Sequence, residues 1–264
     1  MPVDRGQFEN GYRSASLGVW PCPRCKKGGL KVPNRWFLSG SNMDCPTGFA
    51  LPINETRLAP TSFVALLQCD NDLCRFSVPV SGFQTHVDTE NTVAFRLYVQ
   101  YVSPAPAIIK LPPQTPAIVS DQIANANVLF WVDKAACMNR LRIVLEMLLD
   151  HLRIPKWQQS RTGKRRTRRT THARIDLLAK KPRYAMLAKL LLAAKWIGNA
   201  GSHNEETSLT VDDVFDVFDL LEKVLIEVFD PSAPSPEKLA AIINKKKRPL
   251  GRDRTTIQLS RTSP

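Results

Sequence analysis

The sequence predicts an α+β fold, in which a β region at the N-terminal end is followed by an antiparallel bundle of α-helices. Over residues 19–102, short runs of β-branched and aromatic residues alternate with prolines and glycines, as is typical of strands and turns. Over residues 120–230, apolar residues recur every three or four positions, as is typical of amphipathic helices. Five prolines within residues 103–119 predict an extended connector, and hence a domain boundary, between the two patterns.

The first 102 residues are expected to contain an arm and several short strands. Residues 1–18 are polar, contain Gly and Ser and have no periodicity, so they predict a flexible arm. Strands are expected where Val, Leu, Phe and Tyr are frequent, at residues 63–69, 76–80 and 93–102.

The first helical segment of the second half is expected over Gln122–Leu152, as one long helix or as two helices in line. Pro155 ends it, because proline cannot continue a helical hydrogen-bond pattern. Shorter helices are expected near Ala173–Lys180 and over Arg183–Ile197, and Gly198 is expected to end the second of these.

The last strong helix, Val211–Phe229, has the clearest start signal in the chain. Thr210 is expected to be its N-cap, and Asp213 stands at the third helical position, where a carboxylate completes a capping box. Residues 231–264 follow as a basic flexible tail, since they contain too few apolar residues to bury a core.

The composition argues against a membrane protein. The longest apolar run, Leu187–Ile197, is interrupted by two lysines and is shorter than the roughly 20 apolar residues that a membrane helix needs. The first residues lack the apolar core of a signal peptide. We therefore expect a cytoplasmic protein whose six cysteines stay reduced and are available for metal binding.

The net charge of +13 is concentrated in two segments. A basic loop, residues 156–172, has six basic residues and no acid between 161 and 169, and residues 245–264 have seven basic residues against one acid. Because like charges in a short loop repel each other unless a polyanion neutralises them, we expect this loop to contact nucleic acid. The expected contact residues are Arg161, Lys164, Arg165, Arg166, Arg168 and Arg169.

Other roles are open for the basic segments. The loop could be a solvated linker, or its charge could be masked by the acids of the last helix, within one chain or across a dimer. Trp157, just before the charges, could stack on a base. The tail could be a second phosphate-binding arm or a disordered end.

Four cysteines have the spacing of a structural metal site. Cys22 and Cys25 are separated by two residues, and Cys69 and Cys74 by four. Zn²⁺ favours thiolate ligands, and two strand-linked turns that carry four thiolates form a zinc ribbon. The sequence therefore predicts a zinc-ribbon-like β region whose closed site has no open position for a reacting water molecule.

Two further residues are candidates for a displaced ligand, because the second cysteine pair is more widely spaced than the first. These are Cys45 and His86. The alternative to a metal site is a set of buried, metal-free thiols.

Asn199 and His203 fall at the junction between the two last predicted helices. They have an ordinary structural interpretation, with a glycine as a left-handed cap, Asn199 bonded to the backbone of the turn and His203 hydrogen-bonded near a helix end. The alternative is that they form a catalytic site.

The order of these motifs resembles the bacterial family DUF4145. The resemblance is carried by the two cysteine pairs, the proline-rich connector, the helix with Arg142-Ile-Val-Leu-Glu146, the segment Lys195-x-x-Gly-Asn-x-x-x-His203 and the acidic last helix. It covers about residues 19–230. The family is similar to HEPN domains, which are helical bundles of prokaryotic defence, toxin and restriction systems, and many HEPN proteins are metal-independent ribonucleases.

The resemblance implies roles for several residues. In a HEPN-like site, His203 would be the acid and base, Asn199 would position the substrate, and Lys195 would stand where this family usually has arginine. Histidine suits proton transfer near neutral pH because its unperturbed pKa is about 6.5. Arg142 and Glu146 would face the bundle and orient the Gly-Asn turn, or they would form a simple exposed ion pair.

The expected function is that of a nucleic-acid-associated bacterial module in phage defence, restriction or toxin-type regulation, without catalysis of its own. One alternative is a metal-independent HEPN-type endoribonuclease that uses His203. Another is a protein-interaction adaptor with the acidic last helix as its contact face. Expected partners are RNA or DNA, a second copy bound through the helical domain, and a restriction or toxin–antitoxin protein.

Overall fold

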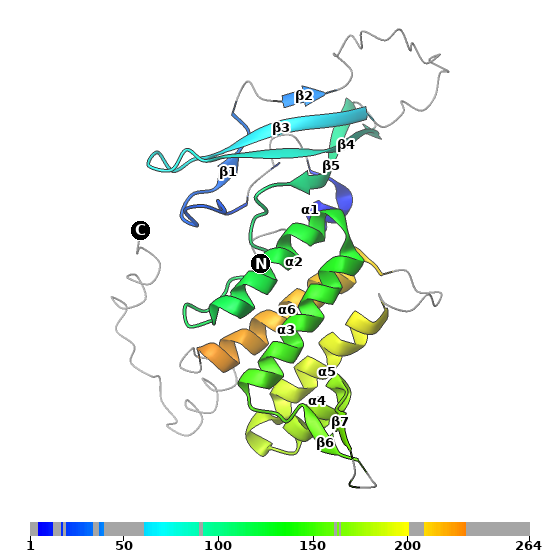
Figure 1. Cartoon of the computed structure of the whole chain (residues 1–264). Coiled ribbons are helices and arrows are strands. Elements are labelled where there is room, and N and C mark those ends of the chain that lie inside the picture. The colour runs from blue at the N-terminus through cyan, green and yellow to red at the C-terminus, as the bar shows by residue number, and fades with distance from the viewer. Residues whose placement is uncertain are drawn as a thin grey trace, which may run out of the picture.

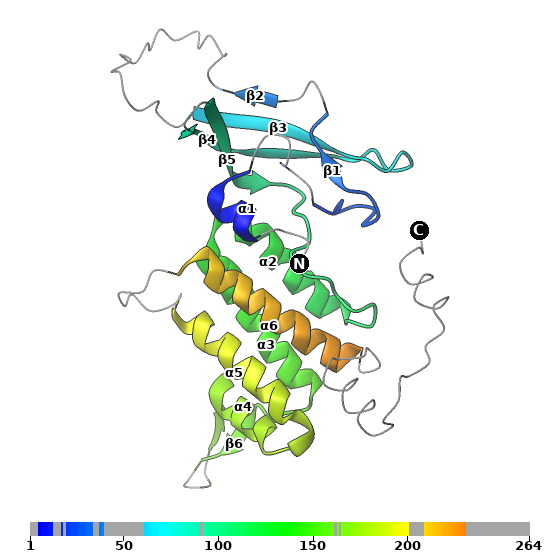
Figure 2. The ribbon, with the colours of Figure 1, turned by 180° about the vertical axis from the view of Figure 1, so that it is seen from behind.

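The computed structural model describes residues 5–12, 17, 20–33, 37–39, 61–89, 92–160, 163, 165–200 and 209–230. It has an α+β fold, with an antiparallel sheet over the first half of the chain and a group of packed helices over the second (Figure 1). Viewed from behind, the same sheet lies at one end of the helices (Figure 2). In the described part of the chain, no helix is both long and apolar enough to cross a membrane.

The sheet is antiparallel throughout and its strand order is β1-β3-β4-β5, with β2 also paired to β3. Along β3 buried residues alternate with more exposed ones, so one face of the sheet lies on the core and the other does not. The strands are β1 (Leu30–Lys31), β2 (Phe37–Ser39), β3 (Thr61–Cys69), β4 (Ser77–Thr89) and β5 (Thr92–Val102).

A glycine is required at one position where β4 pairs with β5. The register of this pair shifts at Ser81/Gly82, and a Cβ atom at Gly82 would lie 2.0 Å from the carbonyl oxygen of Tyr98. Only glycine lets the two backbones approach this closely.

Among the described residues, the helical half has four long helices, a shorter one and a small β-hairpin. The long helices are α2 (Ala117–Val132), α3 (Lys134–His151), α5 (Ala185–Ala200) and α6 (Val211–Phe229). The remaining elements are β6 (Trp157–Gln159), β7 (Arg166–Arg168), α4 (Thr171–Ala179) and a 3₁₀ turn, Pro182–Tyr184.

The first helical segment is not one helix or two in line, as its spacing predicted. The chain turns back at Asp133, which is extended, and α3 packs against α2 (Figures 1 and 2). The Asp133 carboxylate accepts a hydrogen bond of 2.9 Å from the backbone N–H of Ala136, so Asp133 is the N-cap of α3. Apolar residues recur at helical spacing on both sides of Asp133, so the sequence pattern did not indicate this N-cap.

Helix α5 does not end at Gly198, as its glycine predicted, but continues to Ala200. Gly198 is buried inside the helix, and a Cβ atom there would lie 3.2 Å from Cγ of Arg142 on α3. The glycine therefore gives room to the Arg142 side chain, which offsets its low helix propensity.

The start of α6 confirms the predicted capping box. The Thr210 hydroxyl accepts from the backbone N–H of Asp213 at 3.2 Å, and the Asp213 carboxylate accepts from the backbone N–H of Thr210 at 2.8 Å. Such caps are worth about 1 kcal/mol.

The prediction of a flexible arm is wrong for the described residues between 5 and 17. Residues Arg5–Asn10 form helix α1, and the ring of Phe8 lies 4.9 Å from that of Phe130 and 5.9 Å from that of Phe215. Arg5 forms ion pairs with three α6 carboxylates, Asp212, Asp216 and Asp219. These partners are about 200 residues away in sequence, so local composition could not indicate them.

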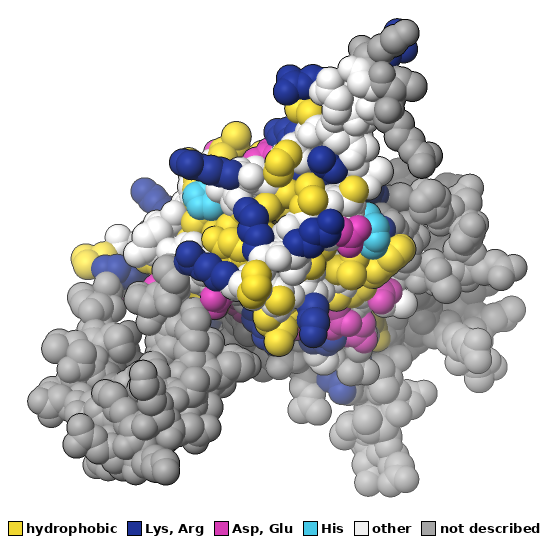
Figure 3. Space-filling view, turned by 90° about the horizontal axis from the view of Figure 1, so that it is seen from below, with side chains coloured by type: hydrophobic (Ala, Val, Ile, Leu, Met, Phe, Trp, Pro, Cys, Tyr) yellow, Lys and Arg dark blue, Asp and Glu magenta, His cyan; other side chains and the backbone are white. Residues whose placement is uncertain are grey.

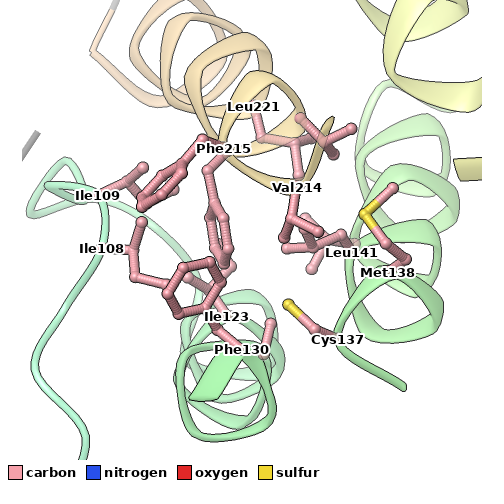
Figure 4. Close-up of a cluster of buried hydrophobic side chains, with 14 of the residues drawn as sticks. Ile108, Ile109, Ile123, Phe130, Cys137, Met138, Leu141, Val214, Phe215 and Leu221 are labelled. Carbon is pink, nitrogen blue, oxygen red and sulfur yellow. The ribbon is translucent and has the colours of Figure 1, made fainter. Parts of the chain in front are cut away.

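One continuous hydrophobic core joins the two halves of the chain. The rings of Trp20 and Trp131 lie 5.0 Å apart, and Ile108 and Ile109 of the proline-rich connector are buried. Figure 4 shows these two isoleucines with side chains of α2, α3 and α6. The connector is therefore part of the core, and the N-terminal half of the chain and the helices support each other.

Candidate metal centre and basic cleft

Strand pairing brings the four predicted cysteines together. Cys22 and Cys25 lie on the turn before β1, Cys69 ends β3 and Cys74 lies on the turn before β4. Because Leu30 pairs with Cys69, the two turns are adjacent. The four Sγ atoms all lie within 4.8 Å of one another and can hold a metal ion.

The distances between the sulfurs fit a tetrahedral ion. Cys22 Sγ lies 3.9 Å from Cys74 Sγ, and Cys25 Sγ lies 3.7 Å from Cys69 Sγ. A regular tetrahedron with metal–sulfur bonds of about 2.3 Å, as for Zn²⁺, has sulfur–sulfur edges of about 3.8 Å.

The backbone around Cys25 favours a thiolate. The N–H groups of Gly28 and Lys27 donate to its sulfur, the former at 3.4 Å, and lower the pKa of Cys25 to about 6. Burial instead raises the pKa of Cys69 to about 12, which disfavours a bare anion at that position. A bound cation would supply the charge that a buried Cys69 thiolate needs.

Both turns have backbone conformations shaped by the cluster. Lys26 and Arg75, each directly after the second cysteine of its pair, have positive φ values of 57° and 47°. A Cβ atom at Gly28 would lie 2.6 Å from Cys69 Sγ, so only glycine fits there. The wider second spacing is accommodated by the Asn71 turn, to whose carbonyl the N–H of Cys74 donates at 2.8 Å.

Of the two spare candidate ligands, His86 does not lie at this cluster. His86 lies on β4, nine residues beyond Ser77, the β4 partner of Gln68, and thus about 30 Å along the strand. Cys45 lies outside the described residues. Cys137 is buried in the helical core, where burial raises the pKa of its thiol to about 12 (Figure 4).

The described part of the predicted basic loop is a short β-hairpin. Strand β6 pairs with β7, and the turn between them has Gly163 at a positive φ of 70°. Side chains of Arg165, Arg166 and Arg168 are exposed, and Trp157 is half exposed on the neighbouring strand. The predicted contacts Arg161 and Lys164 lie outside the described residues, and Arg169 donates to Gln158 at 2.7 Å.

A buried arginine holds the base of the hairpin. Arg174 on α4 is 2% exposed and donates to the Asp150 carboxylate at 2.6 Å and to the Ile154 carbonyl at 2.9 Å. Lys156 pairs with the other Asp150 oxygen at 2.6 Å. Burial opposes ionisation of Asp150, but hydrogen bonds from Lys156 and Arg174 outweigh it and hold the pKa of the carboxyl below its usual range.

Positive charge continues from the hairpin along the following helices. Residues 153–195 contain fourteen Lys and Arg residues and a single acid, Asp176, so this segment alone carries a charge equal to the net +13 of the chain. The end of the molecule seen from below has many Lys and Arg side chains, interspersed with hydrophobic ones (Figure 3). Three of the α6 acids that could have masked this segment, Asp212, Asp216 and Asp219, pair with Arg5 instead.

An open cleft of about 870 Å³ lies beside the hairpin, between α3, α4 and α5. Glu146 of α3 joins the cleft to the hairpin, because its oxygens accept from Arg168 at 2.6 Å and from the Thr171 hydroxyl at 3.0 Å. The lining residues are Asn139, Arg142, Ile143, Leu145, Glu146, Thr170, Thr171, His172, Lys195 and Trp196.

The predicted catalytic and supporting residues are brought together only in part. Lys195 lines the cleft, and Asn199 follows one turn later on α5, with its side chain outside the described set. His203 also lies outside the described residues. Arg142 and Glu146 both line the cleft, yet Glu146 pairs with Arg168, and Arg142 lies against Gly198.

Two cleft residues were missed by sequence reasoning as members of a site. His172 and Trp196 have ring centroids 5.6 Å apart, although 24 positions separate them in sequence. Lys195 Nζ lies 3.5 Å from the Trp196 ring centroid. No local sequence signal indicates this pair, because it depends on how α4 and α5 pack.

These features define an α+β protein with a four-cysteine cluster and a basic helical half. Comparison with family models gives a match over residues 124–250 to a family described as domain of unknown function (DUF4145). The matched segment begins within α2 and includes α3 to α6, so the helical half of this chain is a DUF4145 domain. Comparisons with curated proteins and with solved structures found no match.

Proposed function

We propose that the protein is a nucleic-acid-binding module whose helical half contacts the phosphate backbone. The main support is the charge of residues 153–195, which contain fourteen Lys and Arg residues and one acid. Many of these basic side chains lie on an exposed hairpin and on the helices beside it. Such a surface gains affinity by releasing the counterions of a polyanion. An adaptor role through α6 has less support, because Arg5 already occupies three of the acids on that helix.

The ion that we propose for the cysteine cluster is Zn²⁺, in a structural role. Four thiolates with edges of 3.7 and 3.9 Å suit its tetrahedral preference, and all four positions are filled by protein ligands. The metal would hold the turns of the ribbon, while nucleic acid binds at the opposite, helical end.

The proposed setting is a cytoplasmic bacterial system of phage defence, restriction or toxin-type regulation. Support comes from the resemblance of the helical half to HEPN domains, which serve such systems. The same resemblance supports pairing of two copies through the helical domain, or with a restriction or toxin–antitoxin protein.

Changing Arg165, Arg166, Arg168 and Arg169 together to alanine tests the binding function. We expect weaker binding to labelled single-stranded RNA and duplex DNA, and a salt dependence of log K that is shallower by about 3, because each lost phosphate contact removes about 0.7–1 from the slope. Fluorescence anisotropy between low and moderate salt measures both quantities.

A matched variant with alanines at Lys245, Lys246, Lys247 and Arg248 removes the same formal charge from the tail. If both variants lose the same amount of salt dependence, the total charge of the protein governs binding, and the hairpin has no special role. Absence of binding by the wild type would refute the proposed function.

A second candidate function is metal-independent cleavage of RNA. It is favoured by the position of Lys195, a cation for the phosphorane charge, in the cleft that also holds His172. If this is correct, the wild type should cleave labelled RNA in the presence of EDTA, and the His203→Ala variant should not. Intact RNA with undiminished binding in both proteins would rule out the enzyme and leave the binding module.

A further inference from the structure

The β6–β7 hairpin is bare on both of its faces. Every residue of its two strands, Trp157–Gln159 and Arg166–Arg168, is exposed. Because successive side chains of a strand point to opposite faces, neither face of the hairpin is buried against the body of the molecule. An isolated two-stranded hairpin is at best marginally stable in water, so this one depends on the contacts at its base. Figure 1 shows it at the end of the helices that lies away from the sheet.

The basic side chains of the hairpin divide by position. Three that lie toward its base, Lys156, Arg168 and Arg169, each bind a carboxylate or amide oxygen of the protein. Arg165 and Arg166 lie beside the turn, and their exposed side chains have no hydrogen bond or ion pair with the described residues. The base is therefore fixed, and the two cations next to the turn are available to a ligand.

The dimensions of the hairpin fit one groove of duplex DNA. Its backbone ladder extends from the pair Lys156 and Arg169 to the pair Ser160 and Arg165, which is about 14 Å along each strand. The major groove of B-form DNA is about 12 Å wide and about 8.5 Å deep, and it admits a two-stranded ribbon. The hairpin can therefore reach the floor of this groove while its base stays outside. The B-form minor groove, about 6 Å wide, and the deep major groove of A-form RNA are too narrow for it, and a single strand has no groove.

We propose that the β6–β7 hairpin enters the major groove of duplex DNA, where Arg165 and Arg166 contact base edges and the phosphates along the groove. The inference rests on the proposed nucleic-acid binding and deepens it by naming duplex DNA as the target. An arginine can donate two hydrogen bonds to O6 and N7 of guanine, which both face the major groove. Arg165 and Arg166 are neighbours in sequence and point to opposite faces of the hairpin, so one can contact bases while the other contacts the backbone.

The test compares the double variant Arg165→Ala/Arg166→Ala with the control Lys180→Ala/Lys181→Ala in the whole chain. The control removes two exposed cations outside the hairpin, so both variants have the same formal charge. The probes are a mixed-sequence DNA duplex, one of its single strands and the RNA duplex of the same sequence, with binding measured by fluorescence anisotropy. Dimethyl sulfate methylates guanine N7 in the major groove and adenine N3 in the minor groove, so it reports which groove saturating protein covers. Thermal melting followed by circular dichroism verifies that each variant is folded.

We expect the wild type to bind the DNA duplex at least about fivefold more tightly than the other two probes, and to protect guanine N7 from methylation. The double variant should lose both the preference and the protection, and the control should keep both. Equal binding of the three probes by the wild type, protection of adenine N3 in place of guanine N7, or equal losses in the two variants would each overturn the groove assignment and leave the proposed function standing. If the wild type binds none of the probes, both are wrong.

Discussion

Replacing Cys69 with serine is expected to abolish metal binding by the cysteine cluster and to unfold the turns that carry it. Cys69 is a buried member of the cluster, and three thiolates would hold an ion far more weakly than four. Structural zinc contributes about 10–16 kcal/mol to small zinc-bound folds, more than the ribbon could replace from its own contacts. Because Trp20 of the ribbon packs on Trp131, the helical half should lose stability as well.

Metal content and thiol reactivity measure this effect. Wild-type protein should contain about one zinc per chain by inductively coupled plasma mass spectrometry, and Cys69→Ser well under one. Cys137→Ala is the matched control, since that cysteine lies in the helical core and should leave the metal content unchanged. Wild-type protein with little zinc and with its four ribbon thiols freely titratable would overturn the metal assignment.

Changing Asp150 to alanine is expected to cost about 2–3 kcal/mol of folding free energy. Of the two groups that accept hydrogen bonds from the buried Arg174 guanidinium, the change leaves only the Ile154 carbonyl. Loss of one member of a fully buried ion pair costs about 3–5 kcal/mol, and the value is lower here because the carboxylate is about one-third exposed. The melting temperature should fall by roughly 5–10 °C.

Acid should produce the same loss in the wild type. Because the pKa of Asp150 is lower in the folded than in the unfolded chain, its stabilisation is complete above the unfolded pKa, about 3.9, and disappears as pH falls through the folded value. The difference in melting temperature between wild type and Asp150→Ala should therefore shrink below about pH 4. The control Asp176→Ala removes an exposed α4 carboxylate 3.6 Å from His172 and should cost less than about 0.5 kcal/mol. Equal effects of the two substitutions would contradict the anchoring role of Asp150.

Features with local signals could be predicted from the sequence. The α6 cap needs only Thr210 and Asp213, three positions apart, and both act as expected. The cysteine cluster needed two pairs with ligand spacing, and the pairing of β1 with β3 then brought them together. The division into strands and helices followed from periodicity alone.

Features that depend on distant partners could not be predicted in this way. A glycine can mark the end of a helix, or it can lie inside a helix that passes close to a neighbouring arginine. The residues around Gly198 do not separate these two cases, and only the position of Arg142 does. The pairing of His172 with Trp196 depends on how α4 and α5 pack. Helix α1 is short and polar, and it is held by Phe215 and by carboxylates of α6.

The contact between α1 and α6 sets an order of events during protein synthesis. Arg5 leaves the ribosome first, but its partner Asp216 follows 211 residues later, which takes about 10–40 s at usual elongation rates. Until then Phe8 can meet Phe130 but not Phe215, so the aromatic cluster is incomplete on the nascent chain. A chain interrupted before α6 would leave part of this aromatic cluster exposed, and exposed apolar surface makes incomplete chains prone to aggregation.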